Sequence, residues 1–182
     1  MLAEDPNELF LSTSEILPGF YIGNQRASTD VKFLSKIDVI VNCTKHIKFT
    51  KLTGKKHIYI RIPVNDPGNS DHLSIDDLSD NDDQVIMLKY MPIVIELIAH
   101  YRKQGKRVLV HCHAGMQRSC IIAAAYIICY GQWAAPTLTD RQFRIAKTER
   151  VIRLLVNKRP VAFNGGLSVN FRPALLRFMK LN

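Results

Sequence analysis

The chain has 182 residues, 25 Lys and Arg against 16 Asp and Glu, a formal net charge of +9 and 47% hydrophobic residues. This length suffices for one domain with a substantial core, and the composition excludes a disordered chain. The apolar runs are shorter than the roughly 18 residues that span a bilayer, and the first residues lack the pattern of a secretion signal. Four cysteines in such a chain do not indicate a disulfide framework. We therefore expect an intracellular protein, cytoplasmic or nuclear.

The charge is unevenly distributed along the chain. Residues 66–83 contain seven Asp and no Lys or Arg, so removing this stretch raises the net charge of the remainder from +9 to +16. A basic body fits polyanionic partners, phosphorylated proteins and nucleic acid among them. It also fits a solvated surface that confers only solubility, and the charge alone does not decide between the two.

Strands and helices are expected to alternate along one domain, residues 14–182, after a loose tail at residues 1–13. Short apolar or alternating runs predict strands at 19–23, 38–43, 57–62 and 107–111. Apolar residues at helical spacing predict helices at 28–37, 84–103, 119–130, from 139 or 140 through 155, and at 173–181. The acidic stretch, about 67–83, is expected to be a loop insertion. The alternation predicts an α/β fold with a central, mainly parallel, twisted sheet of about four to five strands, centred near 108–110 and flanked by helices.

The segment from His111 to Ser119, HCHAGMQRS, lies between an expected strand and an apolar helix. Backbone N–H groups of a loop at a helix N-terminus form an anion site, and Gly115 allows the loop to turn tightly. Cys112 begins the loop, where the field of the helix favours the nucleophilic thiolate. Arg118 can bind two oxygens of a phosphoryl group as a planar fork, and Ser119 can hydrogen-bond the sulfur.

Two simpler interpretations of this segment are disfavoured. A buried cysteine is most often only a small hydrophobic side chain, but the pattern H-C-x-x-G-x-x-R-S at one strand-to-helix junction is rare by chance. A metal site built from His111, Cys112 and His113 is weaker still, because adjacent strand residues point to opposite faces and the sequence offers no second ligand cluster. The segment therefore predicts a nucleophilic phosphate site without metal.

The segment resembles the signature of the cysteine-dependent protein phosphatases, and A-G-x-x-R-S at 114–119 resembles that of the dual-specificity branch. Four flanking stretches are similar to stretches of this family in the same order: ILPGFYIGN at 16–24, IDVIVNCT at 37–44, AYII at 125–128, and VNKRP at 156–160 with Asn164. The resemblance covers residues 14–180 and implies the phosphatase fold.

The resemblance implies a two-step reaction without metal or cofactor. Cys112 attacks phosphorus and forms a phosphocysteine intermediate. The phosphate oxygens are bound by residues of the loop, namely His113, Ala114, Gly115, Met116, Gln117 and Arg118. Ser119 eases the departure of the sulfur, and His111 is expected to hydrogen-bond nearby and help hold the thiolate. A carboxylic acid protonates the leaving oxygen and then activates the water that hydrolyses the intermediate.

Two aspartates are candidates for that acid. In the family the acid closes a strand in the context I-P-x-x-D, which Ile62-Pro-Val-Asn-Asp66 matches, although Asp66 lies 46 residues before Cys112. Asp82 lies 30 residues before Cys112 and matches the family distance, but it belongs to the acidic run. We prefer Asp66, because a strand end is fixed by the sheet, whereas an insertion of roughly fifteen residues after it changes only the count.

Cys43 ends a strand that is expected beside the strand leading to Cys112. Some phosphatases of this superfamily protect an oxidised nucleophile through a disulfide to a cysteine in that position. The resemblance therefore implies a reversible Cys43–Cys112 bond under peroxide. The alternative for Cys43 is an inert thiol in the core.

Three functions compete for this sequence. The first is a dual-specificity protein phosphatase that hydrolyses phosphotyrosine and phosphoserine or phosphothreonine on protein substrates. The second is an RNA 5′-phosphatase on the same fold, which the basic body favours and which would make nucleic acid a partner. The third is a non-catalytic module that binds phosphate groups. The intact Cys112, Arg118 and Ser119 argue against this last function.

Overall fold

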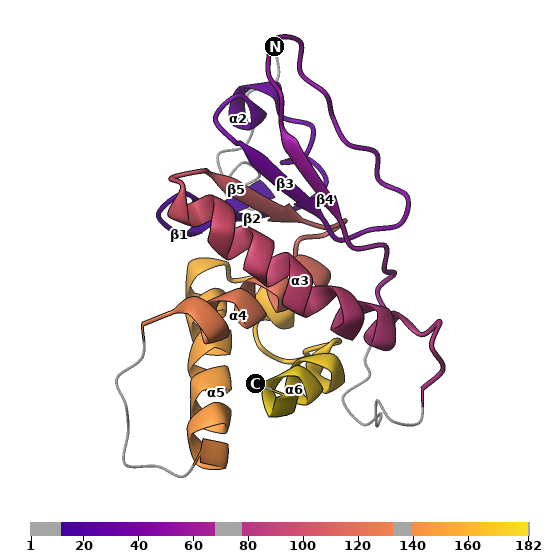
Figure 1. Cartoon of the computed structure of the whole chain (residues 1–182), viewed down its shortest axis with the longest axis vertical. Coiled ribbons are helices and arrows are strands. Elements are labelled where there is room, and N and C mark those ends of the chain that lie inside the picture. The colour runs from indigo at the N-terminus through magenta and orange to yellow at the C-terminus, as the bar shows by residue number, and fades with distance from the viewer. Residues whose placement is uncertain (1–11, 68–77, 133–139, 182) are drawn as a thin grey trace.

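The computed structural model describes residues 12–67, 78–132 and 140–181. Within these residues, five strands form one sheet in the order β1-β2-β5-β3-β4, with β1 antiparallel to β2 and the other neighbours parallel (Figure 1). Their bounds are Thr13–Leu17 (β1), Phe20–Gly23 (β2), Val39–Asn42 (β3), Ile58–Arg61 (β4) and Val108–His111 (β5). The predicted α/β fold and the predicted centre of the sheet are confirmed, since β5 is the middle strand.

β1 is the strand that the alternation did not predict. Thr13, which was expected in the loose tail, pairs with Gly23 of β2. Ile16 is the buried residue of β1, and the strand therefore lacks the apolar alternation by which strands are recognised. Residues 1–11 of the expected tail lie outside the described part of the chain.

Each helix predicted from the sequence is present, with shifts of a few residues at its ends. The bounds are Val31–Leu34 (α2), Asp83–Lys103 (α3), Arg118–Tyr130 (α4), Asp140–Lys158 (α5) and Arg172–Leu181 (α6), and a 3-10 turn, η2, covers Ala162–Asn164. The helix expected at 28–37 shrinks to the single turn α2, which Asp30 caps by accepting the Phe33 N–H at 3.0 Å. Of the acidic insertion, residues 68–77 lie outside the described residues.

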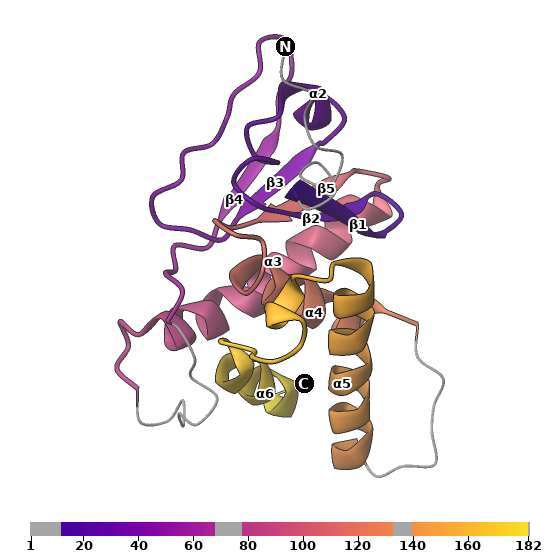
Figure 2. The same cartoon turned by 180° about the vertical axis from the view of Figure 1, so that it is seen from behind.

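The sheet separates two apolar cores. Val39 and Val41 face the main core under α3, α4, α5 and α6, whereas Ile40 between them faces a smaller core that involves α2 and the loop around Leu52. Figures 1 and 2 show the four longer helices on one side of the sheet and α2 on the other. α4 is buried nearly all round, as predicted, because it runs through the main core.

The parallel pairing brings the carboxyl ends of four strands to one edge of the sheet. Gly23, Asn42 and His111 align across β2, β3 and β5, and Arg61 aligns with Asn42 on β4. From this edge the loop of residues 112–117, here called the Cys112 loop, leads from β5 into the N-terminus of α4. Ligands of open α/β sheets bind outside this edge, so the fold places the predicted chemistry where a site is expected.

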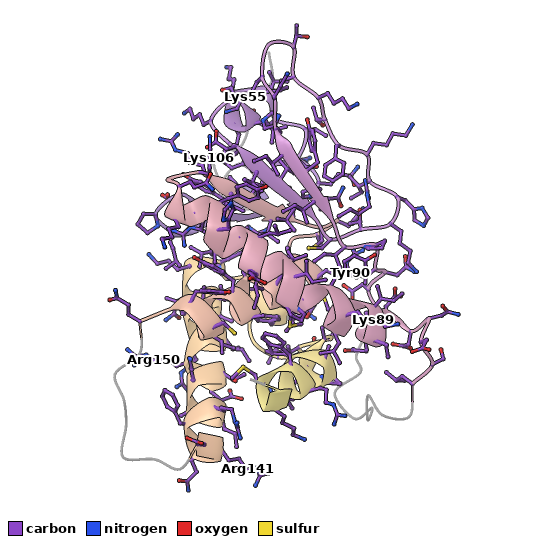
Figure 3. The ribbon with its side chains drawn as sticks, viewed as in Figure 1. Lys55, Lys89, Tyr90, Lys106, Arg141 and Arg150 are labelled. Atoms are coloured by element: carbon purple, nitrogen blue, oxygen red, sulfur yellow. The ribbon has the colours of Figure 1, made fainter. Side chains whose placement is uncertain are left out.

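Exposed basic side chains are spread over several elements. Figure 3 shows Lys106 before β5, Lys89 on α3, and Arg141 and Arg150 on α5, all of them exposed. The positive charge predicted from the composition is therefore distributed over the surface and not confined to the Cys112 loop. Within the described residues, no helix has the length and apolar character needed to cross a membrane.

Candidate active site

The sulfur of Cys112 is the centre of the Cys112 loop. Cys112 is 1% exposed, and two groups lie within hydrogen-bonding distance of its Sγ. The backbone N–H of Gly115 donates to Sγ at 3.2 Å, and the hydroxyl of Ser119 lies 3.3 Å away. Ser119 belongs to the first turn of α4, where the helix carries partial positive charge. All three features stabilise negative charge on the sulfur, and the contact predicted between Ser119 and Cys112 is present.

Two neighbouring segments hold the backbone of the Cys112 loop. Gln25, just after β2, donates its N–H to His113 O at 2.9 Å. Phe163 of η2 donates its N–H to Met116 O at 2.8 Å from the other side. The shape of the loop is therefore fixed by the protein before an anion binds, as electrostatic preorganisation requires.

The loop residues predicted to bind phosphate differ in exposure. His113 and Ala114 are exposed, and His113 lines a cavity of about 340 Å³ beside the loop. Gln117 is buried, and its Nε2 donates to Ser168 O at 3.0 Å. The side chain of Gln117 therefore supports the loop from inside the protein, and the part of Gln117 left to face an anion is its backbone.

Gly115 is required both by its backbone conformation and by the space around it. Its φ of +68° lies in the left-handed region that favours glycine. A β-carbon at this position would lie 2.5 Å from Arg159 Nη2 and 2.7 Å from Gly23 O. The predicted tight turn at Gly115 is confirmed, and the close packing adds a reason that the sequence alone does not contain.

Arg159 is the main structural support that the sequence analysis missed. It is 1% exposed, and its guanidinium donates from Nε to Gly115 O at 2.6 Å, from Nη2 to Ala114 O at 3.5 Å and from Nη1 to Ser14 Oγ at 3.2 Å. Burial lowers the pKa of Arg159, while the nearby Cys120 and Cys112 oppose this shift. The only sequence signal was its place in the stretch VNKRP, which assigned it no role.

Arg118 opens α4 and is half-buried. Its Nη1 donates to Val64 O at 3.3 Å, on the segment that connects β4 to Asp66. Its Nε is buried and has no acceptor among the described residues. A buried N–H without an acceptor is costly, and a phosphoryl oxygen would satisfy it through a charge-assisted hydrogen bond. This geometry agrees with the phosphate fork predicted for Arg118.

The two candidate acids lie in different surroundings. Asp82 is the N-cap of α3, and its carboxylate accepts the N–H of Gln84 at 2.8 Å. Asp66 follows β4, is exposed, and accepts a hydrogen bond from Asn170 Nδ2 at 2.5 Å. The backbone N–H of Asn170 in turn donates to Gln117 Oε1 in the Cys112 loop at 3.0 Å. Asp66 is thus connected to the Cys112 loop through two hydrogen bonds of Asn170, whereas the carboxylate of Asp82 caps a helix.

His111 ends β5 and is fully buried. The role expected for this ring in holding the thiolate stays a prediction, because neither ring nitrogen has a hydrogen-bond partner of ordinary geometry among the described residues. The strand explains why: Cys112 belongs to the main core, whereas His111 points to the opposite face, which Leu109 shares. Burial lowers the pKa of His111 to about 4, contact with the Cys112 backbone opposes the shift, and the charge of Arg61 adds to it. The ring is therefore neutral at pH 7.

A metal ion would need several ligands around one point. Among the described residues, no group of three or more His, Cys, Asp or Glu side chains is arranged to hold one. The three neighbours His111, Cys112 and His113 do not form such a group.

Cys43 lies beside Cys112 across two paired strands. β3 and β5 pair Asn42 with His111, and the N–H of Cys43 donates to His111 O at 2.8 Å. Burial raises the pKa of the Cys43 thiol well above its ordinary value, and the neighbouring Cys112 adds to this increase. The expected adjacency of the two strands is confirmed, while the Cys43–Cys112 disulfide stays a prediction.

A buried sulfur that accepts a loop N–H at the start of a helix, with an arginine on the same turn, has the arrangement needed to attack phosphorus. A parallel sheet that delivers such a sulfur from its middle strand defines the class of the cysteine-dependent phosphatases. Residues 20–158 match the family model described as dual specificity phosphatase, catalytic domain. The chain belongs to this family.

Curated relatives agree with this assignment. The chain is 28% identical over 137 residues to tyrosine-protein phosphatase vhp-1 of Caenorhabditis elegans and 34% identical over 117 residues to human dual specificity protein phosphatase 9. These matches cover 74% and 63% of this chain but only 18% and 26% of the two relatives, so the chain spans about a quarter of their length or less. The solved structure of a mouse putative dual specificity phosphatase complexed with zinc tungstate has the same fold, with a TM-score of 0.69 at 19% identity over 100% of this chain and 92% of that one.

Proposed function

We propose that this chain removes phosphate from phosphotyrosine and from phosphoserine or phosphothreonine of proteins, with Cys112 as the nucleophile. The observation that carries the proposal is the buried sulfur of Cys112 between the Gly115 N–H and the Ser119 hydroxyl. The family of the chain supports phosphorylated proteins as its substrates. Cys43, Cys112 and Cys120 form no disulfide among the described residues, which fits the reducing, intracellular location that is part of the proposal.

In the first step the thiolate of Cys112 attacks phosphorus. The bond from sulfur to phosphorus forms while the bond from phosphorus to the ester oxygen breaks. The carboxylic acid of Asp66 gives its proton to that oxygen, so the side chain of the substrate leaves as a neutral hydroxyl group. Arg118 and the backbone N–H groups of the Cys112 loop bind the remaining phosphoryl oxygens and stabilise their charge.

In the second step water hydrolyses the phosphocysteine. The carboxylate of Asp66 takes a proton from water, whose oxygen attacks phosphorus. The bond from phosphorus to sulfur breaks, inorganic phosphate is released, and the electron pair returns to Cys112 as a thiolate. Gly115 and Ser119, which contact the sulfur, stabilise this returning charge.

The test is turnover of a phosphotyrosine peptide, with the Cys112→Ser variant as the blank. Asp66→Asn should lower kcat by roughly a hundredfold, because the tyrosine oxygen, with a pKa near 10, leaves poorly without a proton. Asp82→Asn is the matched control, since asparagine can still cap α3 and the same charge is removed from the acidic stretch. Its kcat should stay close to that of the wild type.

Each outcome addresses a separate part of the proposal. A wild type that does not exceed the Cys112→Ser blank would overturn the activity itself. Collapse of Asp82→Asn with an active Asp66→Asn would leave the nucleophile in place and reverse the choice of acid. Turnover of a phosphothreonine peptide by the same protein distinguishes dual specificity from specificity for tyrosine alone.

A further inference from the structure

Asn170 connects three parts of the molecule that are far apart in the sequence. It is 7% exposed and lies two residues before α6. Its side-chain Nδ2 donates to Asp66 Oδ1 at 2.5 Å, and its backbone N–H donates to Gln117 Oε1 at 3.0 Å. Its backbone carbonyl accepts a hydrogen bond from Gln84 Nε2 of α3 at 2.5 Å. Asn170 thus joins the proposed acid, the Cys112 loop and α3.

The two glutamines that hold Asn170 are themselves fixed. Gln84 is fully buried, and its Oε1 also accepts the N–H of Ala174 at 3.3 Å. Gln117 is buried, and its Nε2 donates to Ser168 O at 3.0 Å. The backbone of Asn170 is therefore held on both sides by buried side chains. This fixes the position from which its side-chain carboxamide extends.

Asp66, in contrast, has little support of its own. It is exposed and belongs to the irregular segment that follows β4. Among the described residues, the hydrogen bond from Asn170 is the one that its carboxyl group makes. An exposed side chain without such a bond samples several rotamers, and a catalytic acid loses efficiency when it leaves the geometry of proton transfer.

We propose that Asn170 is a positioning residue that holds the carboxyl group of Asp66 in place beside the Cys112 loop. The bond from Nδ2 occupies Oδ1 and leaves Oδ2 to the leaving oxygen of the substrate. Asn170 is also hydrogen-bonded to Gln117. It therefore fixes the position of the acid relative to the loop that binds the phosphate. This inference rests on the proposed function, and in particular on Asp66 as the acid.

The contacts of Asn170 with the Cys112 loop and with α3 are made by its backbone atoms. The contacts with Gln117 and Gln84 use the backbone of Asn170, and both survive a change of its side chain. The side-chain amide is the part directed at Asp66. Replacing the side chain therefore removes the contact with Asp66 and keeps these two backbone contacts.

The test compares two substrates that differ in their need for an acid. A phosphotyrosine peptide needs a proton on its leaving oxygen, whereas 2,4-dinitrophenyl phosphate releases a phenolate that needs none. Asn170→Ala should lower kcat/KM for the peptide by roughly tenfold, the size of one charge-assisted hydrogen bond, and leave that for the activated ester within about twofold of the wild type. Asn170→Asp keeps the shape but offers Asp66 an oxygen in place of the N–H donor, and it should lose at least as much on the peptide.

A double variant gives the readout that a structural role would not produce. When Asp66→Asn has already removed the acid, adding Asn170→Ala should cause no further loss on the peptide. Asn157→Ala is the matched control: it makes the same substitution at an exposed carboxamide on α5 and should leave the rates on both substrates unchanged.

Three results would overturn the inference while leaving the proposed function intact. They are wild-type rates on the peptide for Asn170→Ala, equal losses on both substrates, and a further loss when Asn170→Ala is added to Asp66→Asn. A wild-type protein without turnover overturns both the function and this inference. An active protein that is indifferent to Asp66→Asn overturns the acid, and the positioning role falls with it.

Discussion

Replacing Gly115 by alanine tests how tightly the Cys112 loop is built into the protein. The added β-carbon would lie 2.7 Å from Gly23 O and 2.5 Å from Arg159 Nη2. The carbonyl of Gly23 belongs to β2 and cannot move without disturbing the sheet. Arg159 could move only by leaving its hydrogen bond with Gly115 O. The substitution also places alanine at a φ of +68°, in the left-handed region.

The expected destabilisation has two parts. The left-handed conformation of a residue with a β-carbon costs roughly 1–2 kcal/mol, and overpacking at a site that cannot relax costs roughly 1–3 kcal/mol more. Together the two parts amount to about 3 kcal/mol, which should lower the Tm of a domain of this size by on the order of 10 °C. The displaced Gly115 N–H no longer points at the sulfur of Cys112, so kcat should fall by roughly a hundredfold or more.

Gly54→Ala is the control that separates the two parts. Gly54 also has a positive φ, +79°, but a β-carbon there meets no atom within 4 Å. It should therefore cost only the conformational part, about 1–2 kcal/mol, with unchanged kcat. Calorimetry and turnover of a phosphotyrosine peptide measure both variants. Equal losses of Tm in the two variants would refute the packing argument, because no steric contribution at Gly115 would remain.

Three further predictions concern buried groups of the site. Arg159→Met leaves Gly115 O with only the weak thiol donor of Cys120. It should cost about 2–4 kcal/mol of unfolding free energy and lower kcat, as denaturant titration and turnover would show; an unchanged midpoint would contradict this. Because the pKa of His111 falls from 6.5 to about 4 on folding, the unfolded state binds more protons between these values. The free energy of unfolding should thus drop by up to about 3 kcal/mol as pH falls from 6.5 to 4. An equally steep pH dependence in a His111→Gln variant would show that His111 is not its cause. Mild peroxide should yield a Cys43–Cys112 peptide by mass spectrometry and an inactivation that dithiothreitol reverses, whereas Cys43→Ser should lose both the peptide and the reversal.

The sequence predicted the parts of the molecule whose determinants are local. The nine residues from His111 to Ser119 contain the proposed nucleophile Cys112, Arg118 and the hydroxyl partner of the sulfur, so a single pattern predicted all three. β3 and β5 are short runs of branched apolar residues because both faces of the sheet are covered, and such runs are typical of buried parallel strands. β1 was not predicted because it lies at the edge of the sheet and Ile16 is its one buried side chain.

The supports of the site were not predictable in the same way. Arg159 contacts Gly115 across 44 positions of the chain, and Asn170 contacts Asp66 across 104. No periodicity or spacing connects residues so far apart, and an arginine at the end of a helix or an asparagine in a turn is ordinary on its own. The pattern also places His111 beside Cys112 in the sequence, while the strand turns the two side chains to opposite faces, so the role of this ring stays a prediction.

The structure of the acidic stretch explains how Asp66 can keep its place at the end of β4 although it lies far from Cys112 in the sequence. The N–H of Asn65 donates to Asp83 Oδ1 at 3.0 Å, and Lys45 pairs with the same carboxylate at 3.3 Å. The two ends of the acidic stretch therefore meet at one place, although Asp66 and Asp83 are far apart in the chain. Closing a loop costs free energy that grows only slowly with its length, so added residues between these ends need not move either of them. Asp66 stays near the Cys112 loop because its own segment accepts from Arg118 and its carboxylate accepts from Asn170, and neither contact depends on how many residues follow.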